Sequence, residues 1–303
     1  MKDLIRRLLP PLAVDAMHSV AGSAERRALA AYERSGRLPF SPGYDVYRWR
    51  LIEVVLGDTA LLDQFRTCEP LPAGYGWGVD ERCVEIPWCL SQLGQEPLRL
   101  LDAGSTLNHR VIVSSPPLAN ATLHIATLAP EPECFWQRGI SYFFHDLRDL
   151  PVRDDYYDAV VSVSTLEHIG CDNRLYAGAS ALEDRPADFP LAVRELRRVL
   201  RPAGVLLFTV PFGVHRHFGT FQQFDRTLLA AAIEAFGPTS EVKQTYFRHT
   251  RDGWNLSGEA ECAECEYVDW LMRPSEQRPQ EFPRQPDNAA AARAVACVLL
   301  RKR

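Results

Sequence analysis

The sequence predicts an α/β fold, in which a seven-stranded, mainly parallel sheet has helices on both faces and follows a helical N-terminal extension. From Leu98 onward, short apolar runs alternate with amphipathic stretches, and most runs are apolar along nearly their whole length. Strands of that composition are buried on both faces, as in a parallel sheet between two helical layers. Residues 1–95 lack this alternation. We therefore expect an extension over residues 1–95 and the sheet domain over residues 96–303.

The extension contains three stretches with helical spacing and one of mixed character. Met1–Gly22 places leucines on one face of a short helix broken by a proline pair, and one interpretation is that it docks on a membrane surface or a partner. Ala28–Arg34 and Tyr47–Phe65 are further candidate helices, the second divided at Gly57. Gly74–Leu93 mixes aromatic and charged residues, which predicts a packed lid or a segment that covers a sheet edge.

The rest of the chain supplies two strong helices and all the candidate strands. Pro190–Leu200 is amphipathic and ends at an Arg-Pro-Ala-Gly signal, while Thr227–Phe236 is expected to begin after Asp225 as its N-cap. The seven expected strands are Leu98–Ala103, Ala121–Thr127, Ser141–His145, Ala159–Ser164, Val205–Val210, Glu241–Phe247 and Ala294–Leu300.

Composition and charge exclude several classes of function. The 303 residues carry a net charge of −5, so no basic field indicates a nucleic-acid partner. No apolar run approaches the roughly 20 residues that span a bilayer, and the charged first residues do not resemble a secretory leader. The eight cysteines include one CxxC, Cys262 and Cys265, without a second pair at zinc spacing. We therefore expect reduced thiols, no metal and a cytoplasmic location.

The strand that ends at Asp102 and Ala103 runs into a turn of small residues, Gly104 and Ser105. In an open α/β sheet, ligands bind beyond the carboxyl ends of the strands, where the strand order reverses. A glycine at that point lets the backbone approach a ligand closely. The turn is therefore a candidate ligand site, although the pattern is weak when it stands alone.

Three further motifs follow this turn in a fixed order. The chain reads HDL at residues 145–147, LEH at 166–168 and RVLRPAG at 198–204, with LP and a run of aspartates after the first of them. Over Leu98–Pro211 the chain resembles the class I S-adenosylmethionine-dependent methyltransferases, most closely the methyltransferase type 11 group. That group has LDxGxG, an LP motif after an aspartate, LEH and RVL+PGG in the same order and spacing.

The resemblance implies a Rossmann-like fold with S-adenosylmethionine as cofactor, and it assigns roles to individual residues. Asp102, Ala103, Gly104 and Ser105 would line the methionine end, Asp146 and Leu147 the adenine, and Ser164 would lie beside the sulfonium. Two features depart from the family: the turn keeps only one glycine, and the second strand ends in Thr127 where the family has an acid for the ribose hydroxyls. Thr127 offers a weaker ribose partner, and Glu131 is near enough to substitute.

The resemblance implies methyl transfer to a small-molecule or sugar acceptor, and we expect attack by an oxygen. An oxygen nucleophile needs a base, and His168 and His215 follow the fourth and fifth strands on the expected ligand side. The two departures leave open a catalytically degenerate methyltransferase fold that serves as a binding or scaffold subunit. An NAD-dependent oxidoreductase would need a GxGxxG turn, and residues 104–109 lack its later glycines. The acceptor and the oligomeric state stay open.

Overall fold

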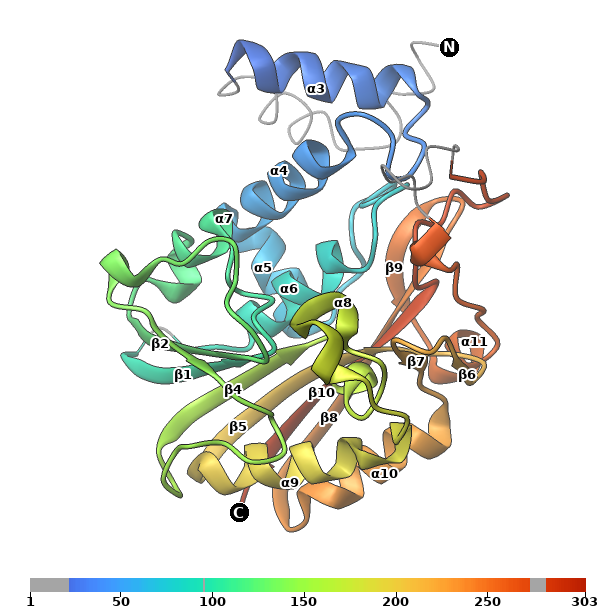
Figure 1. Ribbon diagram of the computed structural model, residues 1–303. Coiled ribbons are helices and arrows are strands. Elements are labelled where there is room, and N and C mark those ends of the chain that lie inside the picture. The colour runs from blue at the N-terminus through green and yellow to red at the C-terminus, as the bar shows by residue number, and fades with distance from the viewer. Residues whose placement is uncertain (1–21, 95, 273–281) are drawn as a thin grey trace.

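The computed structural model describes residues 22–94, 96–272 and 282–303, and its centre is one eight-stranded sheet (Figure 1). The helix predicted within Met1–Gly22 lies outside the described residues. The strand order is β3-β2-β1-β4-β5-β10-β8-β9, and a separate two-stranded pair joins β6 to β7. The strands are β1 (Leu98–Ala103), β2 (Ala121–Thr127), β3 (Ser141–Phe144), β4 (Tyr157–Val163), β5 (Leu200–Pro211), β6 (Arg216–His217), β7 (Gln222–Gln223), β8 (Thr239–Thr250), β9 (Gly253–Ser257) and β10 (Ala294–Lys302).

Five neighbouring strands, β3 to β5 in the sheet order, run parallel, and β10 runs antiparallel to both β5 and β8. All seven predicted strands lie in this sheet, so the mainly parallel α/β fold is confirmed. The sheet has one strand more than predicted, because β9 pairs with β8 in an antiparallel hairpin. Gly253 has φ 87° at the turn of that hairpin, a conformation that glycine adopts without strain.

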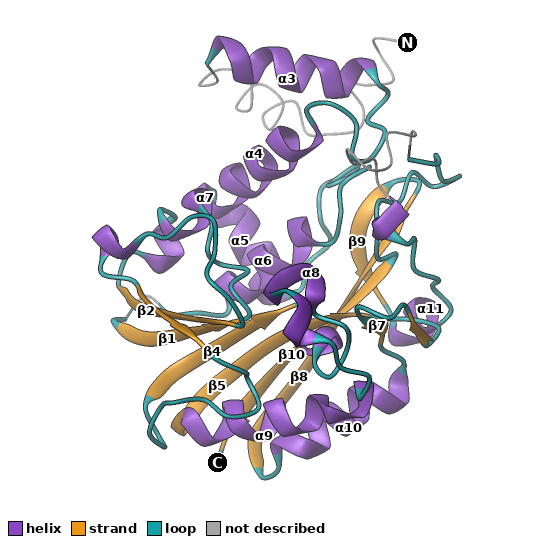
Figure 2. Cartoon of the chain, in the orientation of Figure 1, coloured by secondary structure: helices purple, strands orange, loops and turns teal. Residues whose placement is uncertain are grey.

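Helices cover both faces of the sheet (Figure 2). One layer consists of α9 and α10, and the opposite layer contains α4 to α7 with α3 beyond them. The helices are α3 (Ser23–Arg34), α4 (Tyr44–Gly57), α5 (Thr59–Thr67), α6 (Arg82–Ser91), α7 (Arg110–Val113), α8 (Arg174–Ala177), α9 (Phe189–Val199), α10 (Arg226–Phe236) and α11 (Glu259–Ala263). The predicted division of the second helical stretch is confirmed, because Asp58 caps α5 by accepting hydrogen bonds from the backbone N–H groups of Ala60 and Leu61.

The segment Gly74–Leu93, predicted as a packed lid or a cover for a sheet edge, instead contributes a helix that is buried against the centre of the sheet. In α6 every residue from Cys83 to Ser91 is buried, and the helix packs on β4, β5 and β10 at the centre of the sheet. Side chains from α3 to α6 share one hydrophobic core with residues of β1, β4, β5 and β10. Because of this shared core, the extension positions charged residues of α6 against the strand ends. The division of the chain at residues 95 and 96 stays a prediction.

The predicted N-cap of α10 provides a test of the fold. Asp225 has an extended backbone, and its Oδ1 accepts a hydrogen bond from the Leu228 N–H at 2.9 Å. We expect Asp225→Ala to lower the free energy of unfolding in urea by about 1 kcal/mol, because one N–H of the first turn then lacks its partner. Asp225→Ser keeps an acceptor oxygen and should remain near the wild type. Equal stability of the alanine variant and the wild type would contradict this role.

Candidate active site

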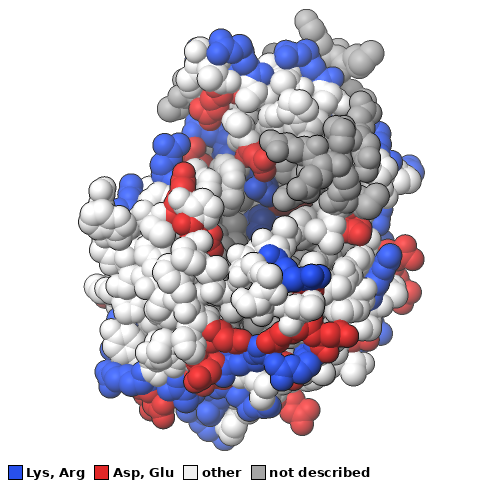
Figure 3. Space-filling model, viewed as in Figure 1, with Lys and Arg blue, Asp and Glu red and all other residues white. Residues whose placement is uncertain are grey.

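The strand order reverses between β1 and β4, and a cavity opens where these strands end. Its volume is about 530 Å³, and it is lined by Arg82, Gly104, Ser105, Thr106, Ala126, Thr127, Leu128, Ala129, Pro130, Glu131, Pro132, Leu147, Ser164, Thr165, His168, Ile169, Asn173, Leu175 and Tyr176. In the space-filling view this face is hollowed near its middle (Figure 3). A reversal of strand order is where open α/β sheets bind ligands, so this cavity is the candidate active site.

Gly104 lies where the turn after β1 touches the loop after β4. Its φ is 119°, and a Cβ at this position would lie only 2.1 Å from Oγ1 of Thr165. Its N–H donates to the Ala126 carbonyl at 2.9 Å, which ties the turn to the end of β2. A side chain at position 104 would collide with Thr165, so glycine is required for the turn after β1 to contact the loop after β4. This contact brings together the two sides of the cavity.

Asp102 and Ala103, both predicted as cofactor ligands, lie behind the cavity wall and are not among its lining residues. Oδ2 of Asp102 accepts a hydrogen bond from the Leu107 N–H at 2.8 Å and so closes the turn. Its Oδ1 is buried and has no hydrogen-bond partner among the described residues. Burial raises the pKa of Asp102 to about 8. Asp102 thus braces the turn and, at neutral pH, is mostly protonated.

Glu131 supplies an acid beside the end of β2, where the strand itself ends in threonine. Its Oε1 accepts hydrogen bonds from Oγ of Ser105 at 2.6 Å and from Oγ1 of Thr127 at 3.2 Å. The same loop is held over the turn by Asn108, whose side-chain amide donates to the Glu133 carbonyl at 2.9 Å. Both hydroxyls thus donate to the same carboxylate oxygen of Glu131. The sequence indicated Glu131 only as a possible substitute.

The two residues predicted to meet the adenine lie in different places. Leu147 lines the cavity, whereas Asp146 does not. Both carboxylate oxygens of Asp146 accept hydrogen bonds from Arg148, which also pairs with Glu183 at 2.7 Å and Asp188 at 3.2 Å. Burial opposes the charged form, but the bonds from Arg148 keep the pKa of Asp146 below its usual value. Its structural role is to anchor this charge network.

Ser164 lines the cavity at the end of β4 and connects it to α6. Its Oγ donates to Oε1 of Glu85 at 2.7 Å, and Glu85 is fully buried. The other oxygen of Glu85 accepts a hydrogen bond from Nη1 of Arg82, whose side chain reaches the cavity. Sequence reasoning missed Arg82 and Glu85 as site residues, because about 80 positions separate them from Ser164. The only sequence signal was the density of charge between the aromatic residues of that segment.

His168 and His215, the two histidines predicted as candidate bases, differ in their position relative to the cavity. His168 is half-buried, lines the cavity, and places Nδ1 at 2.7 Å from the Thr220 carbonyl. Since a carbonyl only accepts, Nδ1 carries the proton and Nε2 keeps its lone pair. Burial lowers the pKa of His168 to about 4, so the ring is neutral at neutral pH. His215 is exposed, with Nδ1 at 2.9 Å from the Gln223 carbonyl, and it does not line the cavity.

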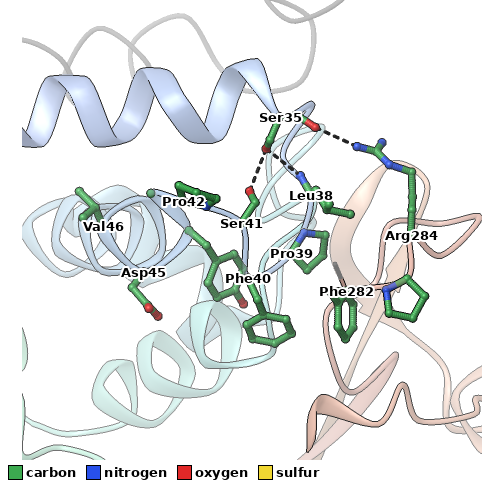
Figure 4. Close-up of a pocket in the computed structure, with 13 residues that line it drawn as sticks. Ser35, Leu38, Pro39, Phe40, Ser41, Pro42, Asp45, Val46, Phe282 and Arg284 are labelled. Atoms are coloured by element: carbon green, nitrogen blue, oxygen red, sulfur yellow. Dashed lines mark hydrogen bonds between the residues drawn. The ribbon is translucent and has the colours of Figure 1, made fainter. Parts of the chain in front are cut away.

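A larger cavity of about 1220 Å³ lies between the connection from α3 to α4 and residues 282–284 (Figure 4). Pro39, Phe40 and Phe282 are among its lining residues, and Nη2 of Arg284 donates to the Ser35 carbonyl at 3.0 Å. No strand end contributes to it. It therefore lacks the arrangement that identifies the candidate active site.

The CxxC motif contains two free thiols. Sγ of Cys262 lies 3.9 Å from the Phe247 carbonyl and Sγ of Cys265 lies 3.6 Å from the Glu261 carbonyl, and both thiols are buried. Within the described ranges, no group of three His, Cys, Asp or Glu side chains is arranged to hold a metal ion. Within the same ranges, no helix is long and apolar enough to cross a membrane.

The donor set of the cavity fits a nucleoside. Glu131 offers a carboxylate oxygen suited to the paired hydroxyls of a ribose, because a carboxylate accepts from two donors. Leu128, Pro130 and Leu147 provide apolar walls for a flat base. The volume is within the range of about 300–1,000 Å³ found for small-ligand pockets. The cavity can therefore accept S-adenosylmethionine, with Gly104 and Ser105 at the turn between the strands.

Residues 117–208 match a family model described as a methyltransferase domain. No curated protein matches the sequence.

Solved structures similar to this chain include three methyltransferases. A putative methyltransferase from Bacillus halodurans has 14% identity, covering 70% of this chain and 94% of that chain, with a TM-score of 0.42. The 1,6-didemethyltoxoflavin-N1-methyltransferase of Burkholderia thailandensis, solved with S-adenosylhomocysteine, has 13% identity, coverage of 93% and 91%, and a TM-score of 0.41. A possible histamine N-methyltransferase from Thermotoga maritima has 14% identity, coverage of 91% and 97%, and a TM-score of 0.41. At these scores the likeness carries no argument about substrate.

The raised pKa of Asp102 predicts a pH dependence of stability. An unfolded aspartate titrates near pH 4, roughly, so the folded state holds this proton more tightly. The group's contribution to stability is complete below about pH 4 and is lost as the pH rises through about 8. Asp102→Asn stays neutral and keeps an oxygen for the Leu107 N–H. We expect the free energy of unfolding in urea of Asp102→Asn to rise relative to that of the wild type as the pH increases from about 4 to about 8. A difference between the two proteins that stays constant with pH would contradict the raised pKa of Asp102.

Proposed function

We propose, from the premise that this chain is a class I S-adenosylmethionine-dependent methyltransferase, that it methylates a hydroxyl oxygen of a small hydroxylated molecule such as a saccharide. The observation that supports methylation at oxygen is the protonation state of His168. A neutral imidazole with a free Nε2 at the cavity suits an acceptor whose nucleophile must lose a proton.

Some residues of the cavity would bind the cofactor, and others would orient and deprotonate the acceptor. When bound, S-adenosylmethionine supplies an electrophilic methyl group, and its thioether leaving group needs no proton. Glu131 would accept the ribose hydroxyls, Leu147 would pack against the base, and Ser105 would border the methionine end. The chain's main remaining task is to align the acceptor oxygen and to exclude water.

His168 can act as a base although its pKa is low. The acceptor hydroxyl would donate its hydrogen bond to Nε2, which directs an oxygen lone pair toward the methyl group. As the oxygen forms its new bond, it becomes far more acidic than the starting alcohol. Even an imidazole whose pKa is about 4 then takes the proton downhill, late in the reaction. The ring of Tyr176 lies edge-to-face with that of His168, with 5.4 Å between the ring centres.

The proposal is tested by identifying the atom that receives the methyl group. The enzyme would be incubated with S-adenosylmethionine labelled with ¹³C in the methyl group and a panel of sugars, amino sugars and small alcohols. Nuclear magnetic resonance distinguishes a methyl group on oxygen from one on nitrogen or carbon by its chemical shift. A labelled O-methyl product is the expected result. A product labelled on nitrogen or carbon would overturn the oxygen assignment.

The role of Glu131 predicts a specific loss of cofactor affinity. Glu131→Gln removes the charge that accepts the ribose hydroxyls, and each charge-assisted hydrogen bond contributes about 1.5–3 kcal/mol. We expect S-adenosylhomocysteine to bind about 10- to 100-fold more weakly in isothermal titration calorimetry. Glu133→Gln is the matched control, since its exposed side chain lies on the same loop. Unchanged affinity of the Glu131 variant would contradict the assignment.

The role of His168 predicts a loss of turnover without a loss of cofactor binding. His168→Asn keeps a side-chain donor for the Thr220 carbonyl but has no basic nitrogen at the Nε2 position. We expect kcat on the acceptor found above to fall about 100-fold or more, while the Kd of S-adenosylhomocysteine stays constant. His215→Asn serves as the control, because its exposed ring lies outside the cavity lining. If kcat were retained in the His168 variant, the base would have to be another group.

A further inference from the structure

Arg82 is the only lysine or arginine among the described residues that line the candidate active-site cavity. It is the first residue of α6, and its side chain is 25% exposed although every residue of the helix from Cys83 onward is buried. The exposed part of the side chain therefore lies where the cavity is. Helix α6 supplies the positive charge of this cavity.

A buried carboxylate fixes one side of the Arg82 guanidinium. Nη1 donates to Oε2 of Glu85, which is fully buried, and Oε1 of Glu85 accepts from Oγ of Ser164 at 2.7 Å. Ser164 is itself held at the end of β4, because its N–H donates to the Thr209 carbonyl at 3.1 Å. Glu85 thus connects Arg82 to the end of a central strand and orients the guanidinium.

The other side of the guanidinium is available to a ligand. A guanidinium has five N–H donors in a planar fork, and Nε and Nη2 of Arg82 donate to no group among the described residues. The N–H groups of Nε and Nη2 form one edge of the fork, whose spacing matches the two oxygens of a carboxylate. Because Arg82 lines the cavity, a bound carboxylate can reach this edge.

The other acids near Arg82 carry no unpaired charge that would repel an anion. Asp80 accepts a hydrogen bond from Arg48 at 2.6 Å. Burial raises the pKa of Glu81 to about 8 and that of Glu167 well above its usual value, so both are mostly protonated at neutral pH. These three acids are therefore paired or uncharged, and the positive end of the α6 dipole favours an anion at Arg82.

The strand order places Arg82 on the acceptor side of the cavity. The residues assigned to the cofactor come after β3, β2 and β1, and they are Leu147, Glu131 and Ser105. The next strand in the sheet is β4, whose end holds Ser164 and, through the buried carboxylate, Arg82. His168 follows the same strand. The proposed base and the guanidinium thus belong to the same side of the cavity.

We propose that the methyl acceptor carries a carboxylate, which binds the Nε and Nη2 edge of Arg82 while an acceptor hydroxyl donates to His168. This inference rests on the proposed function and narrows its acceptor to a hydroxy acid, such as a uronic acid. A single guanidinium matches one negative charge, so a carboxylate fits it better than a phosphate dianion does.

The carboxylate anchors the acceptor, and the hydroxyl reacts. Its oxygen forms a bond to the methyl carbon as the bond between that carbon and sulfur breaks, and the hydroxyl proton passes to Nε2 of His168. The carboxylate oxygens are occupied by the N–H groups of Arg82, which makes them weaker nucleophiles. Arg82 is therefore a residue that determines which acceptor is bound.

The test compares sugars that differ only in the carboxylate. Glucuronate, galacturonate and mannuronate would each be titrated by calorimetry into the protein saturated with S-adenosylhomocysteine, beside glucose, galactose and mannose. We expect at least one uronate to bind about 10-fold or more tightly than its parent sugar, because its hydrogen bonds to Arg82 are charge-assisted. Equal binding of every pair, or no binding by any uronate, would overturn the proposal.

The product shows whether the carboxylate anchors the acceptor or reacts. With S-adenosylmethionine labelled with ¹³C in the methyl group, we expect the bound uronate to yield a methyl ether. Nuclear magnetic resonance distinguishes this ether from a methyl ester, and only the ester is cleaved by mild alkali. A methyl ester would overturn the proposal, because the carboxylate would then be the nucleophile.

Two variants assign the uronate preference to Arg82. Arg82→Lys keeps a positive charge for Glu85 but loses the planar fork. The double variant Arg82→Gln with Glu85→Gln removes both charges of the buried pair together, and urea unfolding checks that both proteins fold. We expect Arg82→Lys to weaken uronate binding about 10-fold, and the double variant to bind each uronate no more tightly than its parent sugar. The affinities for neutral sugars and S-adenosylhomocysteine should not change.

Arg174→Lys is the matched control. Arg174 is exposed on α8 between two residues that line the cavity, but it does not line the cavity itself, so the change should alter none of these affinities. A uronate preference that persists in both Arg82 variants would overturn the proposal. A loss of S-adenosylhomocysteine affinity in place of the uronate preference would also overturn it, since Arg82 would then bind the carboxylate of the cofactor.

The titrations separate this inference from the proposed function. If S-adenosylhomocysteine binds and a neutral sugar is methylated on oxygen without a preference for uronates, the acceptor inference fails and the proposed function stands. If S-adenosylhomocysteine itself does not bind, the premise fails.

Discussion

The site depends on how closely the turn after β1 approaches the loop after β4. Gly104 permits this approach, since a Cβ there would overlap Thr165. Asp102 holds the turn closed from behind, and Ser105 holds Glu131 in front of it. The turn after β1 thus contains a single glycine, and the loop after β2 brings the Glu131 carboxylate against it. The loss of the usual acid at the end of β2 is therefore less of an argument for a degenerate, non-catalytic protein.

The sheet could be predicted from local patterns because strands that are buried on both faces are apolar along nearly their whole length. The bounds of β1 and β2 agree with the prediction residue for residue, and α9 differs by one position at each end. The strand β9 is not predicted from the sequence, because its five residues mix polar and apolar side chains without a clear alternation. Helix α6 escaped notice because Pro87 and several charged residues interrupt an otherwise apolar stretch. The position of α6 is determined by its packing on β4, β5 and β10, which lie far from it in the sequence, and a local pattern cannot contain that information.

The site residues were predictable to the extent that they lie on the matched strands. Of the predicted site residues, Gly104, Ser105, Thr127, Leu147, Ser164 and His168 line the cavity, whereas Asp102, Ala103, Asp146 and His215 do not. The residues of the first group lie at the cavity because the strands end there. Contacts with neighbouring residues keep the second group away from it. Arg148 engages Asp146, and the Leu107 N–H binds Asp102. Arg82 and Glu85 come from the extension, and only the packing of α6 on the sheet brings them to Ser164.

Burial shifts two ionisable groups near this site toward their uncharged forms. It raises the pKa of Glu81 to about 8 and lowers that of His168 to about 4. The contribution of Glu81 to stability is lost as pH rises through about 8, and that of His168 is lost as pH falls through about 4. At neutral pH the ring of His168 is therefore uncharged, which is the state that a general base requires.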